Sequence, residues 1–245
     1  YKLVVDRHSN FKFHTSTNKS LKYRAFHWVS RFTVQKANLT IVTNQYLADI
    51  VSKWGGNPFV LQDKLPSLCL AKNTVLEGSN NLVLVSSFSD DEPIDEILNA
   101  SLLLDKDTVL YITGNWNTLS KKWLNNLPPQ VRLTGYLAEK EFQSLLYSVD
   151  AIIALTTQEN TLLCSAYEAI SLQKPLITSD TEELKSYFRT GVIFTDHSTN
   201  SIIRNINYVI SNKNEITNEI GELGNILTKE WQPKFLKLVS LINKL

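Results

Sequence analysis

The sequence contains no methionine, two cysteines and no long hydrophobic run. Cys69 and Cys164 lie far apart and lack the spacing of metal ligands, so neither a disulfide framework nor a zinc site is indicated. No apolar stretch approaches the roughly eighteen residues that span a bilayer, and the first residues do not resemble a signal peptide. We therefore expect a cytoplasmic protein that holds no metal ion. The absent initiator methionine indicates a piece of a longer chain.

Two phosphate-binding motifs are absent as well, because neither GxGxxG nor GxxxxGK[ST] occurs. The sequence thus gives little support for a simple dinucleotide-binding domain or a P-loop protein. With 245 residues, of which 43% are hydrophobic, the chain has ample material for one large or two small hydrophobic cores.

Short apolar strands alternate with helices along the chain, which is typical of parallel sheets covered by helices. We expect strands at 3–8, 38–43, 58–63, 82–88, 108–114, 131–135, 151–155 and 175–178. We expect helices at 21–36, 45–54, 93–104, 119–126 and 138–148, another after Thr161, and a helical C-terminus broken at Gly221 and Gly224. Ligands of such sheets bind at the carboxyl ends of the strands.

Residues 63–79 lose this periodicity and are interpreted as an interdomain linker. We therefore predict a partial N-terminal domain at 1–75 and a second domain at 76–228. The last segment, 229–245, is expected to be a helix that packs back toward the first domain.

Charge is distributed unevenly along the chain, although the formal sum is +1. Residues 7–48 contain no Asp or Glu, so the rest of the chain is net acidic. The basic residues of this region are Arg7, Lys12, Lys19, Lys22, Arg24, Arg31 and Lys36, and the aromatic residues among them are Tyr23, Phe26, Trp28 and Phe32. Such a pattern suits an anionic membrane surface, a phosphate-bearing acceptor or nucleic acid, and a solvated helix face explains it equally well. No nucleic-acid-binding module is recognised, so no nucleic acid is expected as a partner.

Residues 133–180 carry most of the functional information. They read as strand, helix, strand, polar loop, helix, strand, and a polar loop that opens a helix offers backbone N–H groups and a positive dipole end to phosphates. Within this stretch, GYLAEKEFQSLLYSVDAIIAL and SAYEAISLQKPLITSD resemble segments of the C-terminal domain of GT-B glycosyltransferases of the retaining family 4 type.

Shorter segments resemble the β-mannosyltransferase subgroup of the lipid-linked chitobiose pathway. They are VVDRHSN at 4–10, VLQDKLP at 60–66 and VSSFSDDEPIDEILNA at 85–100. The resemblance implies an α/β fold of GT-B type, with two Rossmann-like domains whose parallel sheets face a cleft, the N-terminal domain being incomplete. It also implies a nucleotide-sugar substrate, linked to UDP or GDP, and no cofactor.

The resemblance places the donor nucleotide at Glu168, since a carboxylate there accepts hydrogen bonds from the ribose in that family. The first glutamate of the E-x7-E motif fits poorly, because Asn160 occupies its position and Glu159 lies one residue earlier. Either residue is a candidate for the donor sugar, and Asn160 is equally well explained as a helix N-cap. Thr161 and Leu162 would offer backbone N–H groups to the diphosphate.

Further donor-site candidates end other strands. Ser86 and Ser87 belong to a loop that has three acids, Asp90 to Glu92, where many family 4 enzymes have bases. These acids would repel a diphosphate unless they point away or hold a cation, and they also fit a helix N-terminus. Gly114 and Asn115 are candidates for contacting the base or phosphates, and Tyr136 for packing on the base, with a purely structural role as the alternative.

His8 and Asp6 are the predicted catalytic residues. The resemblance matches His8 to a histidine near the transferred sugar, and Asp6 would orient it as a general base or phosphate contact. The alternative is a structural histidine.

These observations predict a glycosyltransferase, specifically a hexosyltransferase, that transfers a sugar from a nucleoside diphosphate sugar to a glycan or lipid-linked acceptor in polysaccharide or glycoconjugate synthesis. The protein would be cytoplasmic, and a peripheral location at the membrane is the alternative. The alternative is a non-catalytic GT-B-like accessory subunit of a glycosyltransferase complex.

Overall fold

The computed structural model describes residues 2–8, 21–68 and 73–245. The chain forms two compact units, which are treated separately below. Unit 1 comprises 1–64, 160–162 and 226–245, and unit 2 comprises 65–159 and 163–225. None of the described helices combines the length and apolarity of a membrane span.

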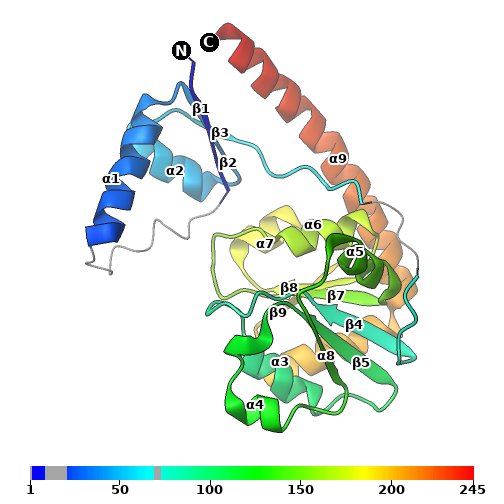
Figure 1. The fold of residues 1–245 in the computed structure, drawn as a ribbon. Coiled ribbons are helices and arrows are strands. Elements are labelled where there is room, and N and C mark those ends of the chain that lie inside the picture. The colour runs from blue at the N-terminus through cyan, green and yellow to red at the C-terminus, as the bar shows by residue number, and fades with distance from the viewer. Residues whose placement is uncertain (1, 9–20, 69–72) are drawn as a thin grey trace. The chain divides into compact units, whose positions relative to one another are not determined.

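Unit 1 is built on a parallel three-stranded sheet of order β1-β2-β3 (Figure 1). Its strands are β1 (Val4–Arg7), β2 (Leu39–Val42) and β3 (Pro58–Val60), and its helices are α1 (Leu21–Lys36), α2 (Gln45–Lys53) and the end of α9 (Lys213–Lys244). Because side chains alternate along a strand, β2 contributes to two cores. Val42 packs with Leu47 of α2 and Val34 of α1, whereas Leu39 packs with Leu238 of α9.

Unit 2 contains a six-stranded, all-parallel sheet of order β6-β5-β4-β7-β8-β9. Its strands are β4 (Asn80–Leu84), β5 (Thr108–Thr113), β6 (Val131–Gly135), β7 (Ala151–Ala154), β8 (Leu176–Ser179) and β9 (Val192–Thr195). The chain starts in the centre at β4, moves outward to β6, and returns to β7 on the other side of β4. This is the Rossmann order, whose ligand crevice lies at the carboxyl ends of the two central strands.

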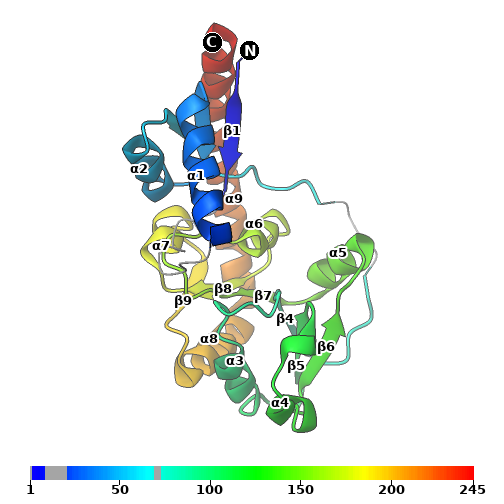
Figure 2. The ribbon, with the colours of Figure 1, turned by 60° about the vertical axis from the view of Figure 1, so that its left-hand side comes forward.

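Helices cover both faces of this sheet, with α3 and α8 on one face and α5 and α6 on the other (Figures 1 and 2). The helices of unit 2 are α3 (Ile94–Ser101), α4 (Lys121–Asn125), α5 (Glu139–Ser148), α6 (Cys164–Ser171), α7 (Glu182–Tyr187), α8 (Thr199–Ser211) and the first part of α9, with a short 3₁₀ helix, η2 (Trp116–Thr118). The central strands are therefore buried on both sides, as their continuous apolar sequences predict.

The structure corrects the expected C-terminal region. The chain there adds the edge strand β9, which the sequence reading missed, and α9 runs unbroken through Gly221 and Gly224. A side chain added at Gly224 would meet Ile170 Cγ2 of α6 at 3.3 Å, and one at Gly221 would meet the Gln173 side chain at 3.6 Å. These glycines therefore allow close packing against α6 and the turn after it, and that packing outweighs the roughly 1 kcal/mol cost of each glycine in a helix.

Candidate functional site

A cavity of about 260 Å³ lies in unit 2 where β4 and β7 end. One wall is the loop from β4 to α3, which contributes Ser86, Ser87 and Glu92. The opposite wall is the beginning of α6, with Ser165 and Glu168. Three predicted site residues, Ser86, Ser87 and Glu168, therefore line one cavity at the topological switch point of the sheet.

Glu168 is one of three half-buried carboxylates that line this cavity, with Asp91 and Glu92. Burial raises its pKa from the usual 4.5 to about 7. Among the residues that the structure describes, none donates a hydrogen bond to this carboxylate. A carboxylate that is poor in protein donors and faces a cavity is suited to accept hydrogen bonds from the hydroxyl groups of a ligand.

The helix that carries Glu168 begins later than expected. Its first residue is Cys164, and its N-cap is Leu163 rather than Asn160, so the N-cap interpretation of Asn160 was wrong. Leu163 makes no side-chain capping hydrogen bond. The backbone N–H groups at the start of α6 therefore belong to cavity-lining residues, and they provide the positive end of a helix dipole beside Glu168.

Hydrogen bonds within the protein hold two of the three acids of the loop at 90–92, and this offsets the repulsion expected between these acids and a diphosphate. Asp91 Oδ2 accepts a hydrogen bond from Thr156 Oγ1 at 2.7 Å, and its backbone oxygen accepts one from Thr157 N at 2.7 Å. The Glu92 carboxylate accepts hydrogen bonds from the loop itself, including Ser87 N at 2.9 Å. Two of the three acids are thus tied to protein donors, and only Asp90 is exposed.

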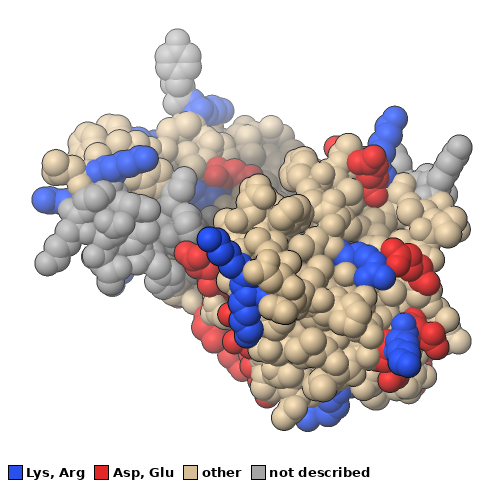
Figure 3. All heavy atoms as spheres, turned by 60° about the horizontal axis from the view of Figure 1, so that its bottom comes forward, with Lys and Arg blue, Asp and Glu red and all other residues tan. Residues whose placement is uncertain are grey.

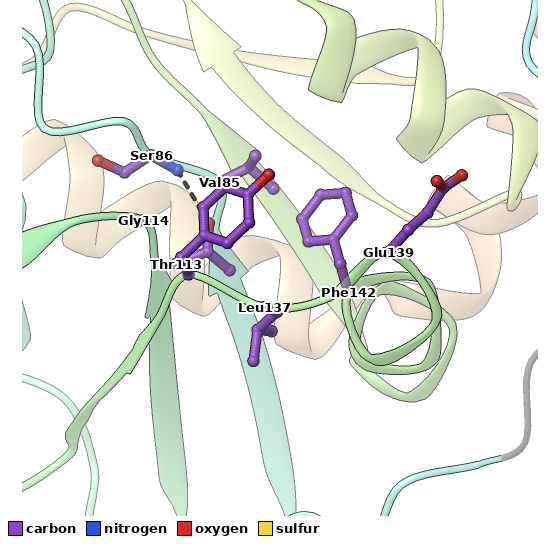
Figure 4. Close-up of a pocket in the computed structure, with 8 residues that line it drawn as sticks. Val85, Ser86, Thr113, Gly114, Leu137, Glu139 and Phe142 are labelled. Atoms are coloured by element: carbon purple, nitrogen blue, oxygen red, sulfur yellow. Dashed lines mark hydrogen bonds between the residues drawn. The ribbon is translucent and has the colours of Figure 1, made fainter.

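A second cavity, of about 350 Å³, lies beside the first at the ends of β4, β5 and β6. Ser86, Gly114 and Tyr136 line it, together with Phe142, which extends from α5 (Figure 4). Ser86 N donates to Thr113 Oγ1 at 3.2 Å, and this bond joins the ends of β4 and β5 (Figure 4). The two cavities share Ser86 and Phe142, so they form two parts of one candidate site.

Gly114 and Tyr136 differ in character. Gly114 has φ +97°, and an added Cβ would lie 2.1 Å from Ser86 O, so only glycine fits between the two strand ends. The Tyr136 side chain is 91% exposed and presents its ring at the cavity margin, where a planar ligand group could stack.

Other predicted donor-site residues lie outside these linings. Asn115 is the N-cap of η2, where its side chain accepts a hydrogen bond from Asn117 N at 3.2 Å. Glu159 is exposed, and residues 160–162 group with unit 1. Contacts to the donor sugar or diphosphate stay predictions for four residues: Glu159, Asn160, Thr161 and Leu162.

His8 belongs to unit 1 and sits between two carboxylates. Its Nε2 is 2.8 Å from Asp6 Oδ1, and its Nδ1 is 2.9 Å from Asp63 Oδ1. Burial lowers the pKa of His8, but the hydrogen bonds and attraction from Asp6 and Asp63 outweigh burial and raise the pKa above 6.5. An imidazolium that donates from both nitrogens has no lone pair to accept a proton, so this geometry suits a positive charge better than a general base.

Sequence reasoning missed three residues that shape these sites: Asp63, Glu92 and Phe142. Asp63 lies 55 residues after His8 in sequence, so only the pairing of parallel strands brings them together. Phe142 could have been predicted from the sequence, because it lies one turn into the helix that follows β6. Within the described ranges, no group of three or more His, Cys, Asp or Glu residues is arranged to hold a metal ion.

A family model described as "Glycosyl transferases group 1" matches residues 79–212, which include both cavities. No curated protein matches the chain.

Solved structures of similar fold are numerous. The sucrose-phosphate synthase from Thermosynechococcus elongatus is 15% identical over 100% of this chain and 68% of that chain, with a TM-score of 0.70. Anabaena Alr3699/HepE in complex with UDP and glucose is 13% identical over 98% and 71%, with a TM-score of 0.77. The pneumococcal O-GlcNAc transferase GtfA in complex with UDP and GlcNAc is 16% identical over 98% and 52%, with a TM-score of 0.68.

This chain thus spans about half the length of some similar structures, for example 50% of TarM. At such identities the likeness shows the fold, and the predicted GT-B fold class is confirmed. The closer resemblance to a β-mannosyltransferase stays a prediction.

Proposed function

We propose, because the chain belongs to the glycosyl transferases group 1 family, that it takes part in transferring a sugar from a nucleoside diphosphate sugar to a glycan or lipid-linked acceptor. Unit 2 would bind the donor and unit 1 would serve the acceptor. The donor is a UDP or GDP sugar, and the transferred group is a hexose. No resident cofactor or metal is part of the proposal.

The observation that carries this proposal is Glu168. Its carboxylate lines the cavity at the switch point, lacks a donor among the described residues and stands beside the start of α6. Ribose hydroxyls would donate to Glu168, while the N–H groups at the start of α6 would bind the diphosphate and stabilise it as the leaving group. UDP is the first nucleotide to test, since HepE and GtfA of similar fold were crystallised with UDP.

The test is thermal stabilisation by nucleotides, followed by assays of sugar-donor hydrolysis and transfer. A ligand at one hundred times its Kd stabilises the folded state by about 2.7 kcal/mol, which is readily measured as a rise in Tm. We expect UDP or GDP to raise the Tm of the wild type, and Glu168→Ala to remove most of the rise. No shift with either nucleotide would overturn the donor-site proposal.

A matched control is Glu183→Ala on α7. Glu183 is also half-buried with a pKa raised by burial, but it is not among the residues lining the cavity. We expect this variant to keep the nucleotide-induced shift, which separates loss of a ligand contact from loss of a buried carboxylate.

For the acceptor side, we propose that Asp6 and Asp63 bind a hydroxyl group while His8 holds both carboxylates in place. Each carboxylate uses one oxygen for His8 in the described pairs, which leaves the other oxygen for a ligand. Asp63→Asn should then lower transfer without changing nucleotide binding.

An anionic membrane surface is the proposed location of the acceptor. On α1, the residues Leu21, Trp28, Val29 and Phe32 are exposed, and the Trp28 and Phe32 rings stack with centroids 5.7 Å apart. At 100° per residue these side chains form one apolar stripe.

Lys22 borders this stripe on one side and Arg24 and Arg31 on the other, while Lys36 lies at its C-terminal end, with Nζ 5.8 Å from the centroid of the Phe32 ring. Lys22, Arg24, Arg31 and Lys36 are all exposed, whereas Lys12, Lys19 and the Tyr23 side chain lie outside the described part of the chain. Elsewhere, on the face drawn in Figure 3, acidic and basic side chains are interspersed. An apolar stripe with basic borders favours the headgroup region of anionic lipid.

Vesicle sedimentation tests this location. We expect binding to phosphatidylglycerol vesicles, weaker binding to phosphatidylcholine vesicles, and loss of binding in a Trp28→Ser, Phe32→Ser variant. Val75→Ser, which changes a 97% exposed apolar residue of unit 2, should bind as the wild type does. Equal affinity for both lipids would contradict the proposal that the basic residues of α1 attract the protein to an anionic membrane.

The alternative function is an accessory subunit without catalysis. Two features favour this alternative. Glu159 and Asn160 depart from the E-x7-E motif, and the loop at 90–92 is acidic. Nucleotide binding without any donor hydrolysis or transfer would support this alternative.

A further inference from the structure

Four donors converge on the Glu92 carboxylate. The backbone N–H groups of Ser87 and Phe88 lie 2.9 and 3.1 Å from its oxygens. The Ser87 hydroxyl lies 2.7 Å away, and the Ser86 hydroxyl forms a further short hydrogen bond. The Ser89 hydroxyl is nearer to Asp91 Oδ1, at 2.8 Å, than to Glu92 Oε1, at 3.2 Å. Phe88 itself adopts φ +58°, in the left-handed region.

Consecutive backbone N–H groups around a left-handed residue form an anion-binding concavity, or nest. Serine hydroxyl groups complete a donor set that also suits the oxygens of a phosphoryl group. In this structure the anion in the nest is a carboxylate of the same chain.

We propose that the loop of residues 86–89 is an anion-binding site for phosphoryl groups, and that Glu92 fills this site from within. Ser86, Ser87 and Glu92 line the same cavity as Glu168, so a phosphoryl group there would reach the nest. The proposal concerns the cavity of the proposed donor site, but it requires only that a phosphoryl anion binds the loop. Ser86 and Ser87 then meet phosphate only when Glu92 leaves.

Glu92 competes effectively because it is tethered. A carboxylate five residues from Ser87 on a folded loop has a high effective concentration at the nest. The apparent affinity for a free anion is therefore the intrinsic affinity multiplied by the fraction of molecules in which Glu92 has left the nest. Removing the carboxylate should therefore increase the affinity for phosphoryl anions, contrary to the usual effect of deleting a site residue.

The neighbouring acids allow a control for charge alone. Asp91 is engaged by Thr156 and Ser89, whereas Asp90 is exposed and bonds to none of the four nest donors in the described part of the chain. Asp90→Ala removes the same charge from the same loop and leaves the nest filled.

Calorimetric titration with inorganic pyrophosphate, at constant ionic strength, tests the proposal on the wild type, Glu92→Ala and Asp90→Ala. We expect Glu92→Ala to bind pyrophosphate at least about tenfold more tightly than the wild type. For Asp90→Ala we expect a change of about twofold or less, because exposed charges are screened. In a sample labelled with ¹⁵N-phenylalanine, the Phe88 amide signal of Glu92→Ala should shift on titration.

Equal gains in Glu92→Ala and Asp90→Ala would overturn the proposal, because they would show a general effect of charge. An unchanged affinity in a Glu92→Ala protein with native circular dichroism would also overturn it. Should Glu92→Ala fail to fold, Glu92→Gln keeps the side-chain size without the charge, and an unchanged affinity there has the same meaning. Pyrophosphate carries no nucleoside, so the result is independent of whether Glu168 binds a ribose.

Discussion

At the scale of single residues, the two candidate carboxylates of the donor cavity are held in opposite ways. Glu92 is surrounded by donors, whereas Glu168 has none among the described residues and is affected mainly by burial. Burial without compensation favours the neutral form, so Glu168 titrates near physiological pH. This difference makes Glu168 the group that a ligand can stabilise most.

We predict that nucleotide affinity rises with pH around the pKa of Glu168. Ribose hydroxyls donate best to the ionised carboxylate, so the affinity should increase from pH 5.5 to about 7 and then level off. Calorimetry between pH 5.5 and 8 measures this. Glu168→Gln corrects for titration of the nucleotide phosphate itself, and a slope equal in both proteins would contradict the prediction.

Stability should show the opposite dependence. The folded-state pKa of Glu168 lies above its usual value of 4.5, so its contribution to folding is most favourable below that value and is lost as the pH rises to about 7. The shift corresponds to at most about 3 kcal/mol, and partial exposure makes the effect smaller. Glu168→Gln should therefore be more stable than the wild type at pH 8, as urea unfolding would show, and the two should converge near pH 4.

At the scale of elements, the candidate site depends on how closely strand ends approach one another. Gly114 and Gly135 both have positive φ and end the neighbouring strands β5 and β6. A Cβ at Gly114 would overlap the backbone oxygen of Ser86, in the loop that follows β4, whereas a Cβ at Gly135 would meet only Trp116 Nε1 at 3.8 Å.

We predict that Gly114→Ala destabilises unit 2 by about 3 kcal/mol or more and disrupts nucleotide binding, because backbone atoms cannot move aside cheaply. Gly135→Ala should cost about 1 to 2 kcal/mol, the strain of the left-handed conformation alone. Urea unfolding of both variants measures the difference. Similar costs would mean that the contact between β4 and β5 relaxes.

Most elements of this fold were predictable, and the failures have identifiable causes. The helix 21–36 was predicted at its observed bounds, as were the apolar strands of unit 2 to within a few residues. The start of α6 was misplaced because its N-cap, Leu163, carries no capping side chain. Local sequence gives no sign that a leucine ends the loop.

The candidate site was predictable where it follows from strand ends, and not where it depends on three-dimensional contacts. Ser86 and Ser87 were found because they follow a parallel strand whose carboxyl end faces the ligand site, and Glu168 was found through the family resemblance. The position of Glu92 was not, because it depends on hydrogen bonds that the folded loop makes to its carboxylate from Ser87 and Phe88.

At the scale of the whole molecule, the two ends of the chain build one core. Leu238, near the C-terminus, is 4% exposed and packs with Leu39 and Leu61 of unit 1. Trp231 Nε1 also donates to Gln62 O at 2.9 Å. A three-stranded sheet has little apolar surface of its own, so the end of α9 supplies part of the core that unit 1 needs.

We therefore predict that Leu238→Ala destabilises unit 1 by about 2 to 5 kcal/mol, the usual cost of removing a buried leucine side chain. Leu236→Ala is the matched control, since Leu236 lies on the same helix and is 57% exposed. Because the donor cavity is lined by unit 2 alone, nucleotide binding by Leu238→Ala should persist at urea concentrations that already unfold unit 1. Hydrogen exchange with and without nucleotide would separate the two units, and simultaneous loss of protection in both would show that they unfold as one.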